Sequence, residues 1–449
     1  MNYRVRRMGG VGCAPAALSG RVAVPGDKSI GHRAVLFAGI GNGTVTVDGL
    51  SGGQDNQRTM VALRQLGATI TERSPFAITV TGCGPDGLRA PGGDLDCGNS
   101  GTSMRLLAGL LGGQHFASRL TGDTYLEARP MRRVAAPLSQ MGVKINGRAG
   151  KKPAEIYPPL HIEPAEEWLH GITYTSPVAS AQVKSAILLA GLYADGSTTV
   201  MEPERSRDHT ERMLAAFGVP ITVEGNAVTL DPTGWDRRLL TGDLVVPGDP
   251  SSAAFLLGAA TIVPGSDVTI VGVLMNPTRT GFFDALQQMG ADLTFIDRRV
   301  VGGEEVADIQ VRAVPRLRGI SIGGELAVRA LDELPLLGAL AAFADGETIV
   351  ADAAELRVKE SDRVLATVTL CRAFGAQAEE RPDGFIVRGQ PTLRGATVQS
   401  FGDHRIAMAA AVLAQVADGE SCIVDVHNVA TSFPTFQSLM IEIGAVIVV

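Results

Sequence analysis

Leu63-Arg64-Gln65-Leu66-Gly67-Ala68 is the first of six copies of one pattern in this chain. Each copy has an apolar residue, two variable residues, a second apolar residue, a glycine, and then alanine or valine. The six glycines are 69 to 85 residues apart, close to one sixth of the 449-residue chain, and they are Gly67, Gly142, Gly218, Gly290, Gly375 and Gly444. A repeat of this kind indicates an architecture built from similar structural units.

Each copy also has a local structural meaning. Its two apolar residues lie three positions apart, as expected for the buried face of a helix's last turn. The glycine follows at the point where a left-handed C-cap is favoured. An apolar residue three positions after the glycine then opens a strand. Each copy therefore predicts a helix that ends at a glycine and leads directly into a strand.

A second recurring phrase runs from an apolar helix through a glycine turn into a β-branched strand. Its first copy is Gly43-Thr44-Val45-Thr46-Val47, and further copies occupy residues 196–200, 346–350 and 419–424. β-Branched residues that follow a turn are typical of strands. Helices that alternate with strand pairs at this period predict six α/β units.

A longer phrase divides the six units into two sets of three. Val24-Pro25-Gly26-Asp27-Lys28-Ser29 recurs as Val246-Pro247-Gly248-Asp249-Pro250-Ser251, about half a chain later. Paired phrases of this kind suggest two strands at which the chain crosses between lobes. We therefore predict one lobe from residues 24–246 and a second, discontinuous lobe from residues 1–23 and 247–449. A cleft between two lobes is a common place for a small-ligand site.

Composition restricts the classes of function. Hydrophobic residues make up 45 % and charged residues 19 % of the chain, as in a compact globular protein. The formal net charge of −7 argues against a broad nucleic-acid or acidic-membrane surface, so any anion site must be local. No apolar run reaches the roughly 20 residues needed to span a bilayer, and the N-terminus lacks a signal-peptide core. We expect a soluble, cytoplasmic protein.

The cysteines and histidines give no framework for disulfides or metals. The five cysteines are widely scattered, contain no CxxC pair, and are Cys13, Cys83, Cys97, Cys371 and Cys422. The seven histidines form no HxxxH pair with neighbouring carboxylates. We therefore expect reduced thiols, no metal and no cofactor.

Basic residues recur beside predicted helix starts. Lys28 and Arg33 flank one such start, where the positive end of the helix suits a phosphate or carboxylate. Gly101 lies in a polar turn, Asn99–Arg105, whose backbone N–H groups can face an anion. Other segments of interest are 127–131 with Arg129, 180–185, 207–211, 276–279 and 401–405 with Arg405. Each has a structural alternative, either a capped helix entrance or self-paired surface charge. Their spread over both halves predicts convergence on a multiply anionic ligand.

The segment Leu356–Arg363 interleaves charged and apolar residues. On a helix, Lys359 and Arg363 would share one face at positions i and i+4. Two like charges so placed cost a few tenths of a kcal/mol unless an anion lies between them. The pattern favours a ligand at this point.

Four segments closely resemble the signatures of the 5-enolpyruvylshikimate-3-phosphate synthase family, in its class II branch. They are Gly26-Asp27-Lys28-Ser29-Ile30, Ser180-Ala181-Gln182-Val183-Lys184, Arg207-Asp208-His209-Thr210-Glu211 and Asn276-Pro277-Thr278-Arg279. The resemblance covers nearly the whole chain. It implies an α/β fold of two lobes, each an inside-out barrel of three βαβαββ copies. It also implies transfer of the enolpyruvyl group of phosphoenolpyruvate to the 5-hydroxyl of shikimate 3-phosphate, in chorismate and aromatic amino-acid biosynthesis.

The resemblance further implies which residues bind the two anionic substrates. Those for shikimate 3-phosphate, mainly in the 24–246 lobe, are Lys28, Ser29, Arg33, Ser180, Ala181, Gln182, Arg207, Asp332 and Lys359. Those for phosphoenolpyruvate are Lys28, Gly101, Arg129, Gln182, Arg363 and Arg405. Arginine suits both phosphate and carboxylate because its planar fork donates two parallel hydrogen bonds.

The family's chemistry requires one acid and one base. The resemblance implies that Glu360 donates a proton to the methylene carbon of phosphoenolpyruvate and that Asp332 accepts the proton of the 5-hydroxyl. Lys359 would orient that hydroxyl and assist Asp332, and Lys28 would lie between both substrates. The structural alternatives are a helix cap for Asp332 and an ion pair with Lys359 for Glu360.

Some positions depart from the family pattern. Gly31 stands where a second serine is usual, Thr431 where class I members have a phosphoenolpyruvate-binding lysine, and Glu355 where they have asparagine. Glyphosate is a possible inhibitor, and class II members that tolerate it typically have alanine at the position of Gly101. We expect a monomer that binds neither nucleic acid nor membrane.

Two alternatives remain open at this point. The first is the sister enolpyruvyl transferase that acts on UDP-N-acetylglucosamine, which uses a loop cysteine near phosphoenolpyruvate. Cys97 is the cysteine closest to a candidate site, but its sequence context does not match. The second is a non-catalytic anion-binding paralogue, which should lack an acid or a base, whereas Asp332 and Glu360 are both present.

Overall fold

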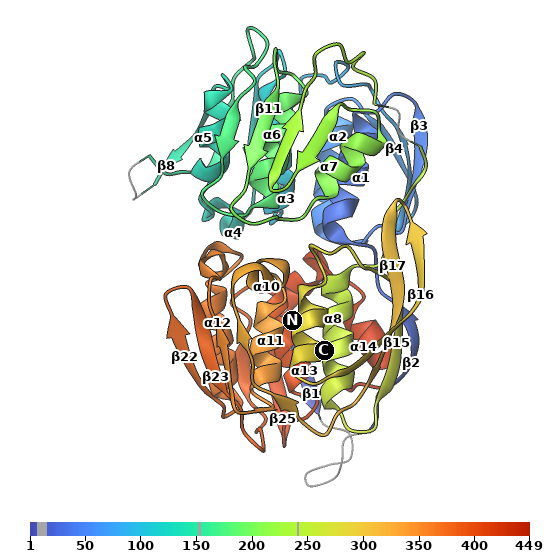
Figure 1. Cartoon of the computed structure of the whole chain (residues 1–449), viewed down its shortest axis with the longest axis vertical. Helices are drawn as coiled ribbons and strands as arrows, with labels where there is room; N and C mark the ends of the chain where they lie inside the picture. The colour runs from blue at the N-terminus through green and yellow to red at the C-terminus, as the bar shows by residue number, and fades with distance from the viewer. Residues whose placement is uncertain (7–15, 151–153, 240–241) are drawn as a thin grey trace. The chain divides into compact units, whose positions relative to one another are not determined.

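The computed structural model describes residues 1–6, 16–150, 154–239 and 242–449, so Cys13 lies outside the described residues. The chain divides into two compact units, here called unit 1 (Met1–Asp27 and Pro247–Val449) and unit 2 (Lys28–Val246). Each unit combines helices with mixed sheets (Figure 1). The chain passes between the units after Asp27 and after Val246, within the two copies of the Val-Pro-Gly-Asp phrase.

The described residues of unit 2 form three four-stranded sheets of the same topology. In each, two neighbouring strands are parallel and the other pairings are antiparallel. The first sheet is β14 (Leu244–Val245), β3 (Thr44–Asp48), β5 (Ala77–Thr81) and β4 (Thr69–Ser74). The second is β6 (Leu95–Asp96), β7 (Ser118–Thr121), β9 (Ile156–Ile162) and β8 (Ile145–Ala149). The third is β10 (Thr173–Thr175), β11 (Thr198–Met201), β13 (Ala227–Leu230) and β12 (Ile221–Glu224).

The part of unit 1 that the structure describes repeats this topology three times. Its sheets combine strands from distant parts of the chain, because β2 and β1 of the N-terminal segment each join strands that follow residue 247. The first sheet is β2 (Ser19–Ala23), β15 (Asp267–Leu274), β17 (Glu304–Arg312) and β16 (Asp292–Val301). The second is β19 (Ser321–Ile322), β21 (Glu347–Val350), β23 (Gly384–Arg388) and β22 (Gln377–Arg381). The third is β24 (Thr397–Gln399), β25 (Glu420–Val424), β1 (Asn2–Arg6) and β26 (Ile447–Val448). A short parallel pair is formed by β18 (Leu317–Arg318) and β20 (Ala344–Asp345).

Three helices in each unit are buried on almost every side. They are α1 (Lys28–Gly39), α3 (Gly101–Gly112) and α6 (Ala181–Gly191) in unit 2, and α8 (Pro250–Ile262), α11 (Leu334–Ala341) and α13 (His404–Leu413) in unit 1. A helix that is apolar all round must be enclosed by other elements. At Gly109 of α3 a Cβ atom would lie 2.2 Å from the carbonyl oxygen of Ala186 in α6, so glycine permits their close contact.

The remaining helices are shorter or only partly buried. In unit 2 they are α2 (Gln54–Gln65), α4 (Thr124–Glu127), α5 (Arg132–Gln140) and α7 (His209–Ala216). In unit 1 they are α9 (Gly281–Gln288), α10 (Gly324–Arg329), α12 (Arg363–Ala373), α14 (Phe436–Glu442) and the 3₁₀ helices η1 (Ala354–Val358) and η2 (His427–Thr431). Within the described ranges, every helix is too short or too polar to span a bilayer.

The six glycines of the repeated pattern all have positive φ, between 82° and 113°. Each lies two residues after a helix, at the ends of α2, α5, α7, α9, α12 and α14. In every copy the N–H group after the glycine donates to the carbonyl of the first apolar residue, as in Ala68 to Leu63, at 2.8 to 3.1 Å. This is the backbone bond of a Schellman C-cap, and a strand begins two or three residues after each glycine. The prediction of helix, glycine and strand is confirmed at all six positions.

The two copies of the Val-Pro-Gly-Asp phrase lie side by side in antiparallel orientation. Asp27 N donates to Pro247 O at 2.7 Å, and Asp249 N donates to Pro25 O at 2.9 Å. Gly26 and Gly248 form a β-bridge between them. These paired residues are called the crossing segments (residues 24–27 and 247–249), and they belong to unit 1.

Candidate active site

The N-terminal ends of several helices of unit 2 are joined by polar contacts. Lys28, the first residue of α1, places Nζ 3.0 Å from Asp55 Oδ2 at the start of α2. Ser103, in the first turn of α3, donates to the backbone oxygen of Asp55 at 3.4 Å. The positive ends of three helices therefore lie at one end of unit 2, where they favour an anion.

Arg33 holds the starts of three helices of this unit together. Its guanidinium donates to Ser29 O at 2.8 Å, to Ser185 Oγ at 2.7 Å and to Thr210 Oγ1 at 2.6 Å. Only 3 % of Arg33 is exposed, so these three donors serve internal partners. Arg207 donates to Ser29 Oγ at 3.2 Å, which places the predicted residues Lys28, Ser29, Arg33 and Arg207 in one connected group.

Gln182 and Gly101 lie in a second group of the same unit. The Gln182 side-chain oxygen accepts from Arg105 Nη1, and its Nε2 donates to Thr102 Oγ1 at 2.9 Å. A Cβ atom at Gly101 would lie 2.8 Å from Arg105 Nη1 and 3.0 Å from Arg129 Nη1. Two guanidinium groups therefore flank the N-terminal turn of α3 beside Gly101. Three of the residues predicted for phosphoenolpyruvate, namely Gly101, Arg129 and Gln182, surround Arg105.

Alanine at position 101 should weaken the binding of phosphoenolpyruvate. The added methyl group would displace two guanidinium tips, because real Cβ atoms do not approach other atoms as closely as 2.8 Å. We expect Gly101→Ala to raise the KM for phosphoenolpyruvate by about tenfold, because displaced guanidinium groups would lose part of their hydrogen bonding to the anion, and hydrogen bonds to charged groups contribute about 1.5–3 kcal/mol. Steady-state kinetics at saturating shikimate 3-phosphate would measure it. Gly93→Ala is the matched control because nothing lies within 4 Å of its added Cβ, and an equal effect there would contradict the prediction.

Ser180 and Ala181 stand at the start of α6. The N–H of Ser180 donates to Glu202 Oε1 at 2.9 Å, and Glu202 also accepts from Ser206 Oγ at 2.6 Å. Lys184, buried on α6, lies 2.8 Å from Glu202 and 2.8 Å from Glu211. Buried ion pairs of this kind fix the loop of Arg207 relative to α6.

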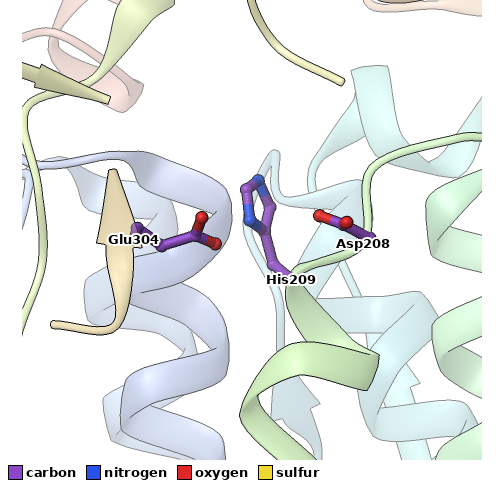
Figure 2. Close-up of side chains that lie close together, drawn as sticks. All are labelled: Asp208, His209 and Glu304. Atoms are coloured by element: carbon purple, nitrogen blue, oxygen red, sulfur yellow. The ribbon is translucent and has the colours of Figure 1, made fainter. Parts of the chain in front are cut away.

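The segment Arg207–Glu211 is largely internal. Asp208 directly precedes α7 and is 1 % exposed, and His209 begins that helix (Figure 2). Asp208 Oδ2 pairs with Arg205 at 3.0 Å and with Arg212 at 2.8 Å. The alternative of self-paired surface charge is wrong here, because both the carboxylate and Glu211 are buried.

In unit 1 the predicted carboxylates and cations form one cluster. Asp332 Oδ1 lies 3.3 Å from Arg363 Nη1 and 3.8 Å from Lys359 Nζ. Its Oδ2 lies 3.7 Å from Arg405 Nη2, and its backbone oxygen accepts from Arg405 Nη1 at 2.9 Å. Glu333, not Asp332, occupies the N-cap position of α11, so the cap alternative for Asp332 is wrong.

Arg363 is the central cation of this cluster and is 1 % exposed. Its Nη2 donates to Glu360 Oε2 at 2.7 Å and its Nε to Asp403 Oδ2 at 2.8 Å. Burial, the largest single effect, raises the pKa of the Asp403 carboxyl, but the charges of Arg363 and His404 and the hydrogen bond from Arg363 together lower it below its usual value. Burial lowers the pKa of Arg363, but the negative charges of Asp403 and Glu360 and the hydrogen bond to Asp403 raise it overall. Both groups are therefore charged at neutral pH.

The helical arrangement predicted for Lys359 and Arg363 is wrong. η1 ends at Val358 and α12 begins at Arg363, so residues 359–362 are not helical. Asp362 starts the new helix because its Oδ1 accepts from the N–H groups of Val364 and Leu365. The turn still brings Lys359 and Arg363 to the same carboxylate, Asp332.

Arg279, at the end of the segment Asn276–Arg279, is buried rather than self-paired on the surface. It donates to Asp27, to Asp249 at 3.1 Å and to Ser251 Oγ at 2.9 Å. Asn276 Oδ1 accepts from Thr278 N at 2.9 Å and from its hydroxyl at 2.7 Å, which forms the turn that aims Arg279 inward.

Asp249 should make stability depend on pH. Burial, followed by the charge of Asp27, raises its pKa to about 6, although Arg279 and Arg405 oppose the shift. Because this value exceeds the unfolded 3.8, the folded state binds the proton more tightly, and the contribution of Asp249 to stability grows as pH falls from about 6 to about 4.

Asp249→Asn removes this titration while keeping a good cap for α8. We expect the unfolding free energy of the wild type to rise relative to the variant, by up to about 3 kcal/mol, as pH falls through that window. Urea unfolding between pH 4 and 7.5 would measure it, and a difference that does not change with pH would refute it.

Sequence reasoning missed several residues of these clusters. Arg105 follows Gly101 by four positions on α3, a helical spacing that offered a signal. Asp55 and Asp403 carry no local signal, because the partner of each lies far away in the chain.

Cys97 is 1 % exposed, burial raises the pKa of its thiol, and such a thiol is a poor nucleophile.

Comparison with known proteins identifies the family. A family model described as EPSP synthase (3-phosphoshikimate 1-carboxyvinyltransferase) matches residues 13–440. The chain is 50 % identical over 441 residues to the 3-phosphoshikimate 1-carboxyvinyltransferase of Citrifermentans bemidjiense, covering 98 % of each chain. It is 51 % identical over 425 residues to that of Geobacter sp. strain M21, covering 94 % of this chain and 96 % of the relative.

Solved structures agree with this family assignment. An EPSP synthase from Acinetobacter baumannii superposes with a TM-score of 0.85 at 42 % identity, covering 100 % of this chain and 99 % of the other. The predicted two-part α/β fold is thereby confirmed. With a matching family model, relatives near 50 % identity and carboxylates clustered with the expected cations, this chain belongs to the EPSP synthase (3-phosphoshikimate 1-carboxyvinyltransferase) family.

Proposed function

We propose that this protein transfers the enolpyruvyl group of phosphoenolpyruvate to the 5-hydroxyl of shikimate 3-phosphate and releases phosphate. Family membership over nearly the full chain supports this reaction. The observation that carries it is the cluster of Asp332, Lys359, Glu360, Arg363 and Arg405 in unit 1. The reaction needs an acid, a base and cations in one place, and this cluster holds all three.

Unit 2 would bind shikimate 3-phosphate. A phosphate monoester carries about −1.5 to −2 charges near neutral pH. Lys28, Ser29, Arg33 and Arg207 form the connected group at the helix starts, and Ser180, Ala181 and Gln182 supply the start of α6. Arg33 gives three donors to internal partners, so its main role would be to hold Ser29 and α6 in place for the ligand.

The residues proposed for phosphoenolpyruvate form one group within each unit. Arg129 and Gly101 of unit 2, together with Gln182 and Lys28, would meet its anionic groups, and Arg105 joins this set by its position. Within unit 1, the proposed residues are Arg363 and Arg405. Glyphosate, also a small anion, would compete for these cations. We place the reaction in the cytoplasm, with a monomer as the active species.

The proposed chemistry is an addition followed by an elimination. Glu360 gives a proton to the methylene carbon of phosphoenolpyruvate, and the 5-hydroxyl oxygen bonds to the neighbouring carbon while Asp332 takes the hydroxyl proton. The carbon–oxygen bond to phosphate then breaks, and a methyl proton returns to a base as the double bond forms again. Lys359, 3.8 Å from Asp332, would orient the hydroxyl.

The approach of phosphoenolpyruvate would prepare Glu360 for this role. At present Arg363 donates to Glu360 at 2.7 Å, which favours the carboxylate. When an anionic substrate takes the guanidinium, Glu360 loses this partner and gains a negative neighbour. Both changes favour its protonated form. Glu360 forms an ion pair with Arg363 at 2.7 Å.

A phosphate-release assay tests the proposal. We expect phosphate only when phosphoenolpyruvate and shikimate 3-phosphate are both present, with 5-enolpyruvylshikimate 3-phosphate detected as the coupled product. UDP-N-acetylglucosamine in place of shikimate 3-phosphate should give none. Release from phosphoenolpyruvate alone, or with UDP-N-acetylglucosamine, would overturn the assignment.

A further inference from the structure

The crossing segments share one buried cation. Arg279 donates to Asp27 of the first segment. It also donates to Asp249 of the second segment, at 3.1 Å. Its side chain is 2 % exposed, and those of the two aspartates are 0 % and 6 % exposed. Removing one partner of such a buried set leaves an uncompensated charge, so the three side chains depend on one another.

A hydrogen-bond chain leads from Arg279 to the proposed active site. Arg279 Nη2 donates to Ser251 Oγ at 2.9 Å, and Ser251 Oγ donates to Glu333 Oε1. Arg405 donates to the same Glu333 oxygen at 3.3 Å and to Ser251 Oγ at 3.4 Å. Arg405 also holds the backbone oxygen of Asp332 at 2.9 Å.

The direction of these bonds is settled by chemistry. A guanidinium can only donate, so Ser251 must accept from both Arg279 and Arg405. Its single proton is then available for Glu333, whose carboxylate accepts. Ser251 thus uses its one proton and both lone pairs, and it is 4 % exposed. No other orientation of the hydroxyl satisfies the three partners.

We propose that Arg279, Ser251 and Glu333 act as positioning residues that fix the guanidinium of Arg405 for phosphoenolpyruvate. The inference rests on the proposed function, because it assumes that Arg405 binds this substrate. A long arginine side chain loses rotamer freedom when it binds an anion. Glu333 and Ser251 remove that freedom beforehand, and Glu333 balances the charge of Arg405 while the site holds no anion.

The same chain of hydrogen bonds links the crossing segments to Asp332. Glu333 follows Asp332 directly, so the hold on Glu333 also limits where the proposed base can lie. Arg405 also lies near enough to Asp249 for its charge to oppose the rise in the pKa of that carboxyl. Loss of the Ser251 link should therefore reach Arg405 without touching a substrate.

Two neighbouring serines allow a matched test. Ser251 and Ser252 both lie in the first turn of α8, and both are buried, with exposed fractions of 4 % and 3 % respectively. The hydroxyl of Ser252 donates to Asp249 Oδ2 at 3.1 Å instead of to Glu333. Ser252→Ala therefore removes a similar buried bond from the same helix without cutting the link to Arg405.

We expect Ser251→Ala to raise the KM for phosphoenolpyruvate about tenfold, because hydrogen bonds to charged groups are lost. The KM for shikimate 3-phosphate should stay within about twofold, and Ser252→Ala should leave both values unchanged. Glu333→Gln keeps an acceptor for Ser251 but loses the charge facing Arg405, so it should also raise the KM for phosphoenolpyruvate. Thermal melting would verify that each variant is folded.

The outcomes separate the two proposals. A folded wild type that makes no product from both substrates would refute the proposed function. An active wild type with equal phosphoenolpyruvate KM values in Ser251→Ala and Ser252→Ala, or with both KM values raised together in Ser251→Ala, would refute the positioning role. The double variant Arg279→Lys/Ser251→Ala adds a further check. Because both residues belong to one hydrogen-bond network, their effects on the KM for phosphoenolpyruvate should not be additive.

Discussion

Replacing Glu360 by glutamine should lower kcat by about 10²–10⁴-fold, the usual contribution of a general acid. Glutamine has nearly the same shape and can still accept a hydrogen bond from Arg363, which donates to Glu360 Oε2 at 2.7 Å. It cannot deliver a proton to the methylene carbon of phosphoenolpyruvate. The loss should therefore appear in kcat, with both KM values changed by less than about fivefold. Steady-state phosphate release with both substrates would measure it.

Glu380→Gln is the control for this variant. Glu380 also accepts from an arginine, Arg357 at 3.1 Å, but it is exposed on β22 and has no part in the proposed chemistry. Its replacement should leave kcat within about twofold, because exposed ion pairs contribute little. If Glu360→Gln kept more than one tenth of the wild-type kcat, Glu360 would not be the proton donor.

Arg363→Lys should weaken both folding and catalysis. Arg363 is 1 % exposed and holds three carboxylates, with Asp403 at 2.8 Å, Glu360 at 2.7 Å and Asp332 at 3.3 Å. A lysine has one ammonium group in place of a planar fork and cannot reach all three. Asp403, which is 0 % exposed, would lose at least one of the two hydrogen bonds that it accepts from Arg363.

We expect this substitution to lower the unfolding free energy by about 2–4 kcal/mol, since it leaves a buried carboxylate incompletely paired. For a chain of 449 residues, the corresponding fall in Tm would be roughly 2–4 °C. kcat/KM for phosphoenolpyruvate should fall by about 10²–10³-fold, because a bidentate contact to an anion is lost. Calorimetry and kinetics on the same preparation would measure both.

Arg388→Lys provides the matched control. Arg388 also pairs with two carboxylates, Glu347 at 2.7 Å and Glu379 at 2.6 Å, but its side chain is 41 % exposed. Water compensates such pairs, so Tm and kinetics should be unchanged. An Arg363→Lys protein with wild-type melting and wild-type kcat/KM would show that the fork of Arg363 has no special role.

Some features of this protein follow from short stretches of sequence. The six glycines could be located because a left-handed residue after an apolar turn is a local requirement that glycine meets at little cost. All six have positive φ and are followed by strands. The candidate residues could be chosen because their motifs resemble those of one family, and Asp332, Lys359, Arg363 and Arg405 do lie together in unit 1.

Other features depend on partners that are remote in the chain. Strand β1 pairs with β25 and β26, more than 400 residues later, and no local pattern names such a partner. The break between Lys359 and Arg363 arises because Asp362 caps a new helix, which charge spacing alone did not indicate.

The sequence by itself therefore determined the repeating helix–glycine–strand units and the residue types of the site, because backbone preference and side-chain chemistry act over a few neighbouring residues. Only the tertiary structure decided that Arg33 and Arg279 are buried among internal acceptors and that Ser251 joins Arg279 to Arg405. Burial and hydrogen-bond partners depend on which distant segments pack together, and that is a property of the whole fold.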